Sequence, residues 1–179
     1  MIPIPSDDYI RILPELVLTV FGMAVMLLDP LLPARASRRP LGWLAFLGTL
    51  LAAAAGAYQV YYPGLAFFGM VRVDSFSIFF HVLIALLAAL VILASFEYLD
   101  QQEIHGGEFY GLVLLGAVGM VLMSSAVELV LIFIALEISS ISTYVLAGFR
   151  RRVAASAESS LKYFQIGRAS CRERVYVLV

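Results

Sequence analysis

The amino-acid sequence predicts an all-α protein, a polytopic transmembrane helical bundle with about five complete spans plus the start of a sixth. Of its 179 residues, 62% are hydrophobic and only 14% are charged, a composition typical of a chain that lies mostly in lipid. Apolar runs of roughly 20 residues, long enough to cross about 30 Å of hydrocarbon, follow one another with short polar breaks. A transmembrane β-barrel would instead alternate apolar and polar residues over segments of about ten, a pattern that this sequence does not show.

The breaks between the apolar runs carry residues that end or start helices. Asp29-Pro30 ends the first span, Pro40 precedes the second, and Pro63-Gly64 closes it. The predicted spans are residues 12–32, 41–61, 76–96, 109–125 and 127–149, and a sixth helix begins near residue 156.

Two groups of arginines predict how the chain is oriented in the membrane. One group lies between the first two spans and the other directly follows the fifth (Arg35, Arg38, Arg39, Arg150, Arg151 and Arg152). Counting crossings places both groups on the same side, and short loops rich in Lys and Arg prefer the cytoplasm. We therefore expect loops 33–40 and 150–155 to be cytoplasmic and the N-terminus to lie outside, in a bacterial-type inner (plasma) membrane.

The sequence contains no signature of a redox or nucleotide-binding site. It has no P-loop, dinucleotide fingerprint, nucleophile motif, or haem or iron-sulfur ligand pattern, and Cys171 is its only cysteine. The net charge of -1 indicates no nucleic-acid-binding surface. We expect no cofactor, no metal and no redox chemistry in this chain.

Glu137 is a single carboxylate near the middle of the fifth apolar run. An acid at the centre of a transmembrane helix costs around 2.5 to 3.5 kcal/mol on insertion scales, so such residues usually have a function. Ser140 and Tyr144 follow it on the same helical face. This pattern predicts a water-accessible, hydrogen-bonding environment in which Glu137 exchanges protons. The alternative is a structural hydrogen bond from protonated Glu137 to a neighbouring helix.

Other ionisable residues of the spans allow a structural interpretation and a functional one. Glu128 precedes Glu137 by nine residues, which places it on about the opposite side of the helix, so the two acids cannot form one site. Glu128 is expected to be a solvated acid at a helix start, with a role in proton entry as the alternative. Lys162 follows Glu158 at i+4, which predicts either a surface ion pair or a lysine carried inward toward Glu137. Glu15 and His81 are interpreted as interfacial or helix-contact residues.

The fifth span carries a resemblance to a known family. ELVLIFIALEISSISTYVLAGFRR at residues 128–151, followed by AESSLKYF at 157–164, resembles subunit N of the proton-pumping NADH-quinone oxidoreductase, respiratory complex I. The stretches PELVL, LLDP and VDSFSIFF add supporting matches. The related subunits L and M usually carry Trp before the glutamate, whereas this sequence has Leu136.

The resemblance implies that Glu137 and Lys162 match the mid-membrane glutamate and the lysine that opens the sixth helix. They would belong to a charged axis coupling quinone reduction elsewhere in the complex to proton translocation, with Ser140, Tyr144 and Glu128 as supporting polar residues. The implied partners are other membrane subunits of the complex, the lipid bilayer and, indirectly, the quinone pool. NADH, quinone, flavin and iron-sulfur clusters are expected only in the wider complex. The alternatives are a subunit of a related cation/proton antiporter or membrane-bound hydrogenase, and a membrane scaffold.

The end of the sequence departs from this pattern. Residues 166–175 read IGRASCRERV, which places Arg168, Arg172 and Arg174 where a sixth span should become most apolar. The codons ATC GGA AGA GCG TCG TGT AGG GAA AGA GTG, a common sequencing-adapter read, encode it residue by residue. We therefore expect 166–179 to be non-native and 1–165 to be the N-terminal part of an antiporter-like membrane domain from a longer protein. The alternative is a native basic tail.

Overall fold

The computed structural model describes residues 6–33, 37–101, 106–150 and 154–177, with side chains over 7–33, 37–100, 106–150 and 155–167. The long helices are α2 (Leu13–Leu28), α3 (Arg39–Tyr58), α4 (Ser75–Gln101), α5 (Glu108–Ser125), α6 (Leu129–Ala147) and α7 (Ala154–Val177). The short elements are α1 (Ser6–Arg11), the 3-10 turns η1 (Asp29–Leu31), η2 (Gln59–Tyr61) and η3 (Phe67–Gly69), and the antiparallel strands β1 (Gly64–Ala66) and β2 (Val71–Val73). Helices α2 to α6 are long and apolar enough to cross a membrane, which confirms the predicted all-α bundle.

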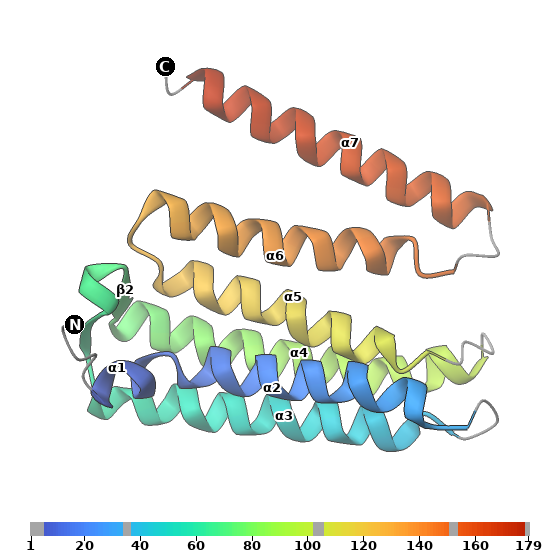
Figure 1. Ribbon diagram of the computed structural model, residues 1–179, viewed down its shortest axis with the longest axis horizontal. Coiled ribbons are helices and arrows are strands. Elements are labelled where there is room, and N and C mark those ends of the chain that lie inside the picture. Colours follow the sequence, from blue (N-terminus) through green and yellow to red (C-terminus); the bar gives the residue numbers. More distant parts are fainter. Residues whose placement is uncertain (1–5, 34–36, 102–105, 151–153, 178–179) are drawn as a thin grey trace.

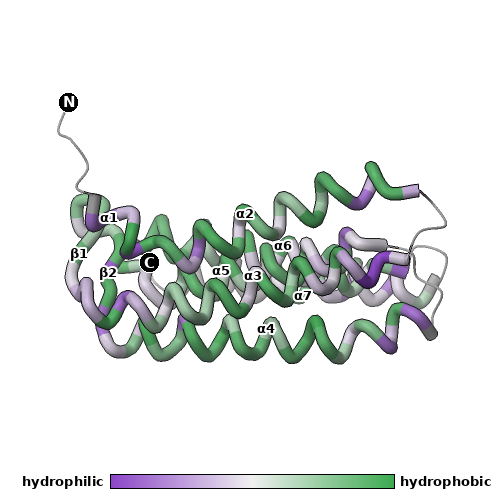
Figure 2. The backbone as a smooth tube through the Cα atoms, turned by 90° about the horizontal axis from the view of Figure 1, so that it is seen from below, coloured by the Kyte–Doolittle hydropathy of each residue, from purple (hydrophilic) through white to green (hydrophobic). Residues whose placement is uncertain are grey.

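The long helices lie side by side with nearly parallel axes, and α7 slants away from α6 (Figure 1). We call the end that holds α1, β1 and β2 the hairpin end, and the end that holds Arg38, Arg39 and Arg150 the arginine end. Apolar residues dominate the middle of the spans and hydrophilic residues gather mainly toward these two ends (Figure 2). This distribution is the one expected for a bundle that crosses hydrocarbon.

Helix α4 begins at a reciprocal cap. The Ser77 backbone N–H donates to Asp74 Oδ1, and the Asp74 N–H donates to Ser77 Oγ, both at 2.9 Å. Such a capping arrangement satisfies backbone donors that have no partner within the helix. It starts α4 at Ser75, and the helix continues to Gln101, five residues beyond the predicted end of the third span.

Helix α6 is shorter than its predicted span because residues on its N-terminal side are used by the hairpin. The Val127 N–H donates to the Met70 carbonyl at 2.8 Å, and Ala126 forms a bridge with Val71. These bonds hold the α5–α6 connection against β2. The sequence did not predict this hairpin or α1, since each is only a few residues long.

The core lies between α2, α3, α4 and α5, and small residues allow these helices to approach closely. Ala45 and Ala52 of α3 and Ala117 of α5 are fully buried beside larger side chains such as Leu18 and Leu114. Many large apolar residues are instead exposed on the outside of the bundle, Leu27, Leu90 and Leu129 among others. Exposed apolar surface of this kind suits contact with lipid.

Helix α7 begins at Ala154, close to the predicted start of the sixth helix, and continues to Val177 through the predicted non-native tail. The side chains of Arg168, Cys171, Arg172 and Arg174 lie outside the described residues. The boundary between residues 165 and 166 therefore stays a prediction.

The α5–α6 contact predicts a position that does not tolerate a side chain. A Cβ on Gly119 would lie 2.6 Å from both the Ala135 carbonyl oxygen and the Ser139 nitrogen, which are backbone atoms of α6. We expect Gly119→Ala to reduce the free energy of unfolding by about 1 to 3 kcal/mol, as overpacking does, because the two helices must move apart. The measurement is the thermal melting of the purified full-length protein.

Gly116→Ala is the matched control for this change. Gly116 lies on the same helix, and a Cβ there would meet only Ser142 Cβ at an ordinary 3.6 Å. Equal melting temperatures for the two variants would contradict the proposed close contact at Gly119.

Candidate functional site

Glu128 lies at the start of α6. It is the N-cap residue, its carbonyl accepts a bond from the Ile132 N–H at 3.0 Å, and its side chain is exposed. A carboxylate at this place meets the positive end of the helix dipole. This is the position that a solvated helix-start acid occupies.

Glu137 lies in the middle of α6, on the side of the helix that faces away from α5. Ala135 and Ser142 are the buried residues of α6, and a helix turns about 100° per residue, which puts Glu137 roughly opposite both. Its side chain is half-buried between the exposed residues Phe133 and Ile141. Among the described residues, nothing forms a hydrogen bond or ion pair with its carboxylate.

The polar turn that follows Glu137 is satisfied in part by its own helix. Ser142 Oγ donates to the Ile138 carbonyl at 2.9 Å, and Thr143 Oγ1 donates to the Ser140 carbonyl at 2.8 Å. These hydroxyls are therefore engaged with the backbone. The Ser140 hydroxyl has no partner among the described residues, and it follows Glu137 by three residues on the same face.

Tyr144 is where α7 docks on α6. Its ring contacts Tyr163 and Phe164 at centroid separations of 5.1 and 5.5 Å. The Ser160 hydroxyl donates to the Tyr144 carbonyl at 2.9 Å, and Gly167 passes close to the Tyr144 hydroxyl. The residue predicted to support Glu137 therefore also anchors the helix that carries Lys162.

Lys162 forms an ion pair with Glu158. Lys162 Nζ lies 2.5 Å from Glu158 Oε1, and both side chains are about two-thirds exposed, at 67% and 63%. The structure thus contains the surface pair at i+4 that one interpretation predicted. It does not bring Lys162 into contact with Glu137.

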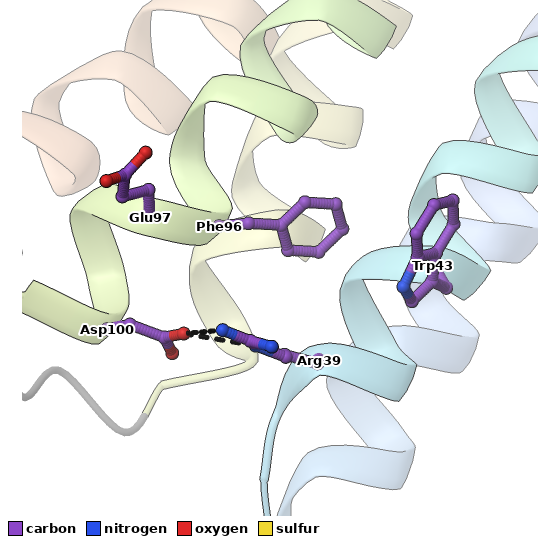
Figure 3. A pocket seen from close by; sticks show the side chains of 5 residues that line it. All are labelled: Arg39, Trp43, Phe96, Glu97 and Asp100. Carbon is purple, nitrogen blue, oxygen red and sulfur yellow. Dashed lines mark hydrogen bonds and ion pairs between the residues drawn. The ribbon is translucent and has the colours of Figure 1, made fainter.

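The arginine end brings together charges from loops that are distant in sequence. Arg39 Nε and Nη2 donate to Asp100 Oδ2 at 3.0 and 2.5 Å, which ties the start of α3 to the end of α4. Trp43 and Phe96 line the same groove of about 470 Å³, whereas Glu97 points away from Arg39 (Figure 3). Asp29 and Arg38 form a second ion pair at 3.0 Å. The C-terminal end of α4, which carries Glu97 and Asp100, therefore lies at the arginine end of the bundle.

A metal ion needs a grouping of several ligand side chains. Over the described ranges, no three or more His, Cys, Asp or Glu side chains are grouped so as to hold a metal ion. The sequence-based interpretation did miss one constellation, a buried cluster at the hairpin end that joins Glu15 and His81 to Gln59 and Ser125. These residues come from four separate segments, so only the fold brings them together.

The bundle belongs to the class of antiporter-like membrane subunits, as a match to a family model and similarity to named proteins show. Residues 126–172 match the family "NADH:quinone oxidoreductase/Mrp antiporter, TM", a stretch that includes all of α6. The chain is 60% identical over 171 residues to NADH-quinone oxidoreductase subunit N 2 of Koribacter versatilis, covering 92% of this chain and 35% of that protein. Subunit N of Trichlorobacter lovleyi is 40% identical over 156 residues, covering 87% of this chain and 32% of that protein.

A solved structure supports the same relationship. Respiratory complex I from Thermus thermophilus with bound aureothin matches with a TM-score of 0.71 and 32% identity, over 91% of this chain and 35% of that one. The chain is thus a relative of subunit N of NADH-quinone oxidoreductase, and the resemblance seen in the fifth span is confirmed. It spans about a third of the length of the relatives it matches.

The Tyr144 contact predicts how α7 is held. Each aromatic pair contributes about 0.5 to 1.5 kcal/mol beyond its buried area, and Tyr144 makes two such pairs. We expect Tyr144→Ala to loosen α7, seen as faster hydrogen–deuterium exchange of the amides of residues 155–165 in the full-length protein. Tyr144→Phe keeps both ring contacts and serves as the control. Equally fast exchange in both variants would contradict this docking role.

Proposed function

We propose that the complete protein to which this chain belongs is a proton-translocating membrane subunit of NADH-quinone oxidoreductase. It would couple quinone reduction elsewhere in the complex to proton transport. The observation that carries this proposal is Glu137, a half-buried carboxylate in the middle of a membrane-spanning helix, without a partner among the described residues and inside the segment that matches the family model. Such a group takes up and releases protons without forming a fixed ion pair.

The chain itself is proposed to carry no redox centre. NADH, flavin, iron-sulfur clusters and quinone would be bound by other subunits, and this chain would contact neighbouring membrane subunits and lipid. The absence of a nucleotide-binding or cluster-binding motif from the sequence supports this division of roles.

The orientation is also part of the proposal. The arginine end would face the cytoplasm and the hairpin end the outside, because Lys and Arg in short loops are retained on the cytoplasmic side. Arg38 and Arg39 lie at the start of α3 and Arg150 follows the end of α6, and these helix ends lie at the same end of the bundle (Figure 1), which supports this orientation.

In the proposed mechanism, Lys162 and Glu137 bias one another's protonation through their charges. A positive charge on Lys162 favours ionised Glu137, and withdrawal of that charge favours proton uptake. Glu158 competes for the same lysine, since it pairs with Lys162 in the structure.

A cation/proton antiporter subunit is the second candidate. It is favoured by one observation, that the matching family includes Mrp antiporters as well as NADH:quinone oxidoreductases. The relatives described above carry the oxidoreductase name, which favours the first function. Genes for subunits M and L beside this one would point to complex I.

The first test replaces Glu137 in the full-length subunit. We expect Glu137→Gln to lower proton pumping per electron while the complex still assembles, because the amide keeps the size of the side chain but cannot be ionised. Pumping is measured in vesicles during quinone reduction. Asp7→Asn, which changes an exposed acid outside the spans, is the control.

Two outcomes would count against this role. Unaltered pumping stoichiometry in Glu137→Gln is one of them. The other is that Glu137→Leu reduces assembly of the complex but leaves the number of protons pumped per electron unchanged in each complex that does assemble. That result is expected for a scaffold in which Glu137 only joins helices.

The second test separates a relay role of Lys162 from a surface role. Lys162→Met removes the charge that would act on Glu137, so we expect pumping to fall. Glu158→Gln removes only the surface partner, and exposed pairs contribute about 0 to 1 kcal/mol, so we expect little loss of stability and pumping close to normal. Equal pumping in wild type and Lys162→Met would restrict Lys162 to the surface pair.

A further inference from the structure

Four buried polar side chains meet at the hairpin end of the bundle. They come from α2, η2, α4 and α5, and their exposed fractions are 6% for Glu15, 0% for Gln59, 0% for His81 and 2% for Ser125. Polar side chains that are shielded from both water and lipid need hydrogen-bond partners within the protein. The donor and the acceptor in each contact can therefore be assigned one by one.

The Gln59 amide is oriented by the backbone. Its nitrogen donates to the Arg11 carbonyl at 2.7 Å and lies 3.4 Å from the Ile10 carbonyl. The opposite orientation would place the amide oxygen against these two carbonyl oxygens, which are acceptors only. The amide oxygen therefore faces His81.

This orientation fixes the tautomer of His81. Its Nδ1 lies 2.7 Å from Gln59 Oε1, and since that oxygen can only accept, Nδ1 carries a hydrogen. In the neutral ring the other nitrogen, Nε2, is then a bare acceptor. Because Gln59 holds Nδ1–H, Nε2 is the nitrogen of His81 that can accept a proton or a hydrogen bond on the other side of the ring.

Nε2 is the ring nitrogen that faces Glu15. Glu15 Oε1 lies 3.9 Å from it. The Ser125 hydroxyl lies 3.4 Å from Glu15 Oε1, while Glu15 Oε2 and His81 Nε2 make no hydrogen bond within the described part of the chain. A bare carboxylate beside a bare ring nitrogen would leave two buried acceptors repelling one another.

We propose that Glu15 and His81 form a buried site that binds one proton between the carboxylate and Nε2. The ligand is a hydrogen ion, held either as the acid form of Glu15 or as the imidazolium of His81. Neutral side chains lose less solvation on burial than an ion pair, so the acid form of Glu15 predominates. At 3.9 Å, the proton crosses through one bridging water or after a small side-chain rotation.

The charges around this site are few and largely engaged with one another. Asp8 and Arg11 of α1 form an ion pair at 3.1 Å. Asp74 caps α4, where its Oδ1 accepts a hydrogen bond from the Ser77 N–H. Gln59 and Ser125, the partners from η2 and α5, are neutral. The proton therefore remains the main means of balancing the Glu15 charge.

This site is separate from Glu137 and does not depend on the function proposed above. The two acids lie on α2 and α6, and α5 packs against both of these helices. The role of His81 and Glu15 is thus more specific than the helix contact that the sequence indicated.

The experiment is infrared difference spectroscopy on the assembled complex that contains the full-length subunit. We expect the wild-type minus Glu15→Gln spectrum at neutral pH to show the band of about one protonated carboxyl group. The band should persist at pH values where exposed carboxyl groups are ionised, because losing this proton leaves a buried negative charge. Carboxylate bands for Glu15 combined with imidazolium bands for His81 would equally support one shared proton.

Ionised Glu15 together with neutral His81 would overturn the proposal. Asp7→Asn, which alters an exposed acid on α1, is the control and should lack the persistent band. Glu15→Gln should still fold, because its amide N–H can donate to Nε2; thermal melting checks this. His81→Gln tests the other partner, and an unchanged Glu15 band in that variant would also count against the shared site.

Discussion

The structure depends on one constraint, that every backbone N–H and carbonyl inside hydrocarbon must find its partner within the protein. Helices satisfy this rule internally, so the spans form regardless of what they later contact. Their association then relies on close packing, since lipid is as apolar as the side chains. At Gly119 the absence of a side chain lets the backbone of α5 approach that of α6, which positions Glu137 on the opposite side of α6.

The same constraint applies to side chains, and the chain meets it in two ways. Asp29 is buried but paired with Arg38, and Glu15 is buried beside His81 and Ser125. Glu137 has no such neighbour among the described residues. An enclosed and partnered acid holds its charge state firmly, whereas an unpartnered acid changes it whenever a charge or water approaches. The contrast is the reason why the proposed proton transport is assigned to Glu137 and not to Asp29 or Glu15.

The spans and the position of Glu137 within one of them could be predicted because they depend on local sequence alone: the length of apolar runs, prolines at their ends and the place of one acid in a run. The Gln59 and His81 contact could not, since 22 residues separate them and only the fold sets their distance. The direction of Lys162 was also undetermined. Spacing at i+4 allowed both the Glu158 pair and an inward lysine, and the choice depends on how α7 packs.

An unpartnered carboxylate at the centre of a span costs around 2.5 to 3.5 kcal/mol on insertion scales. Among the described residues, no side chain forms a hydrogen bond or ion pair with Glu137, and Tyr144 holds α7 against the part of α6 that follows it. The curated relatives are about three times as long as this chain. We therefore expect the polar groups that complete the Glu137 site to come from residues outside the described part of the chain. A test of the proposed proton transport thus requires the full-length subunit.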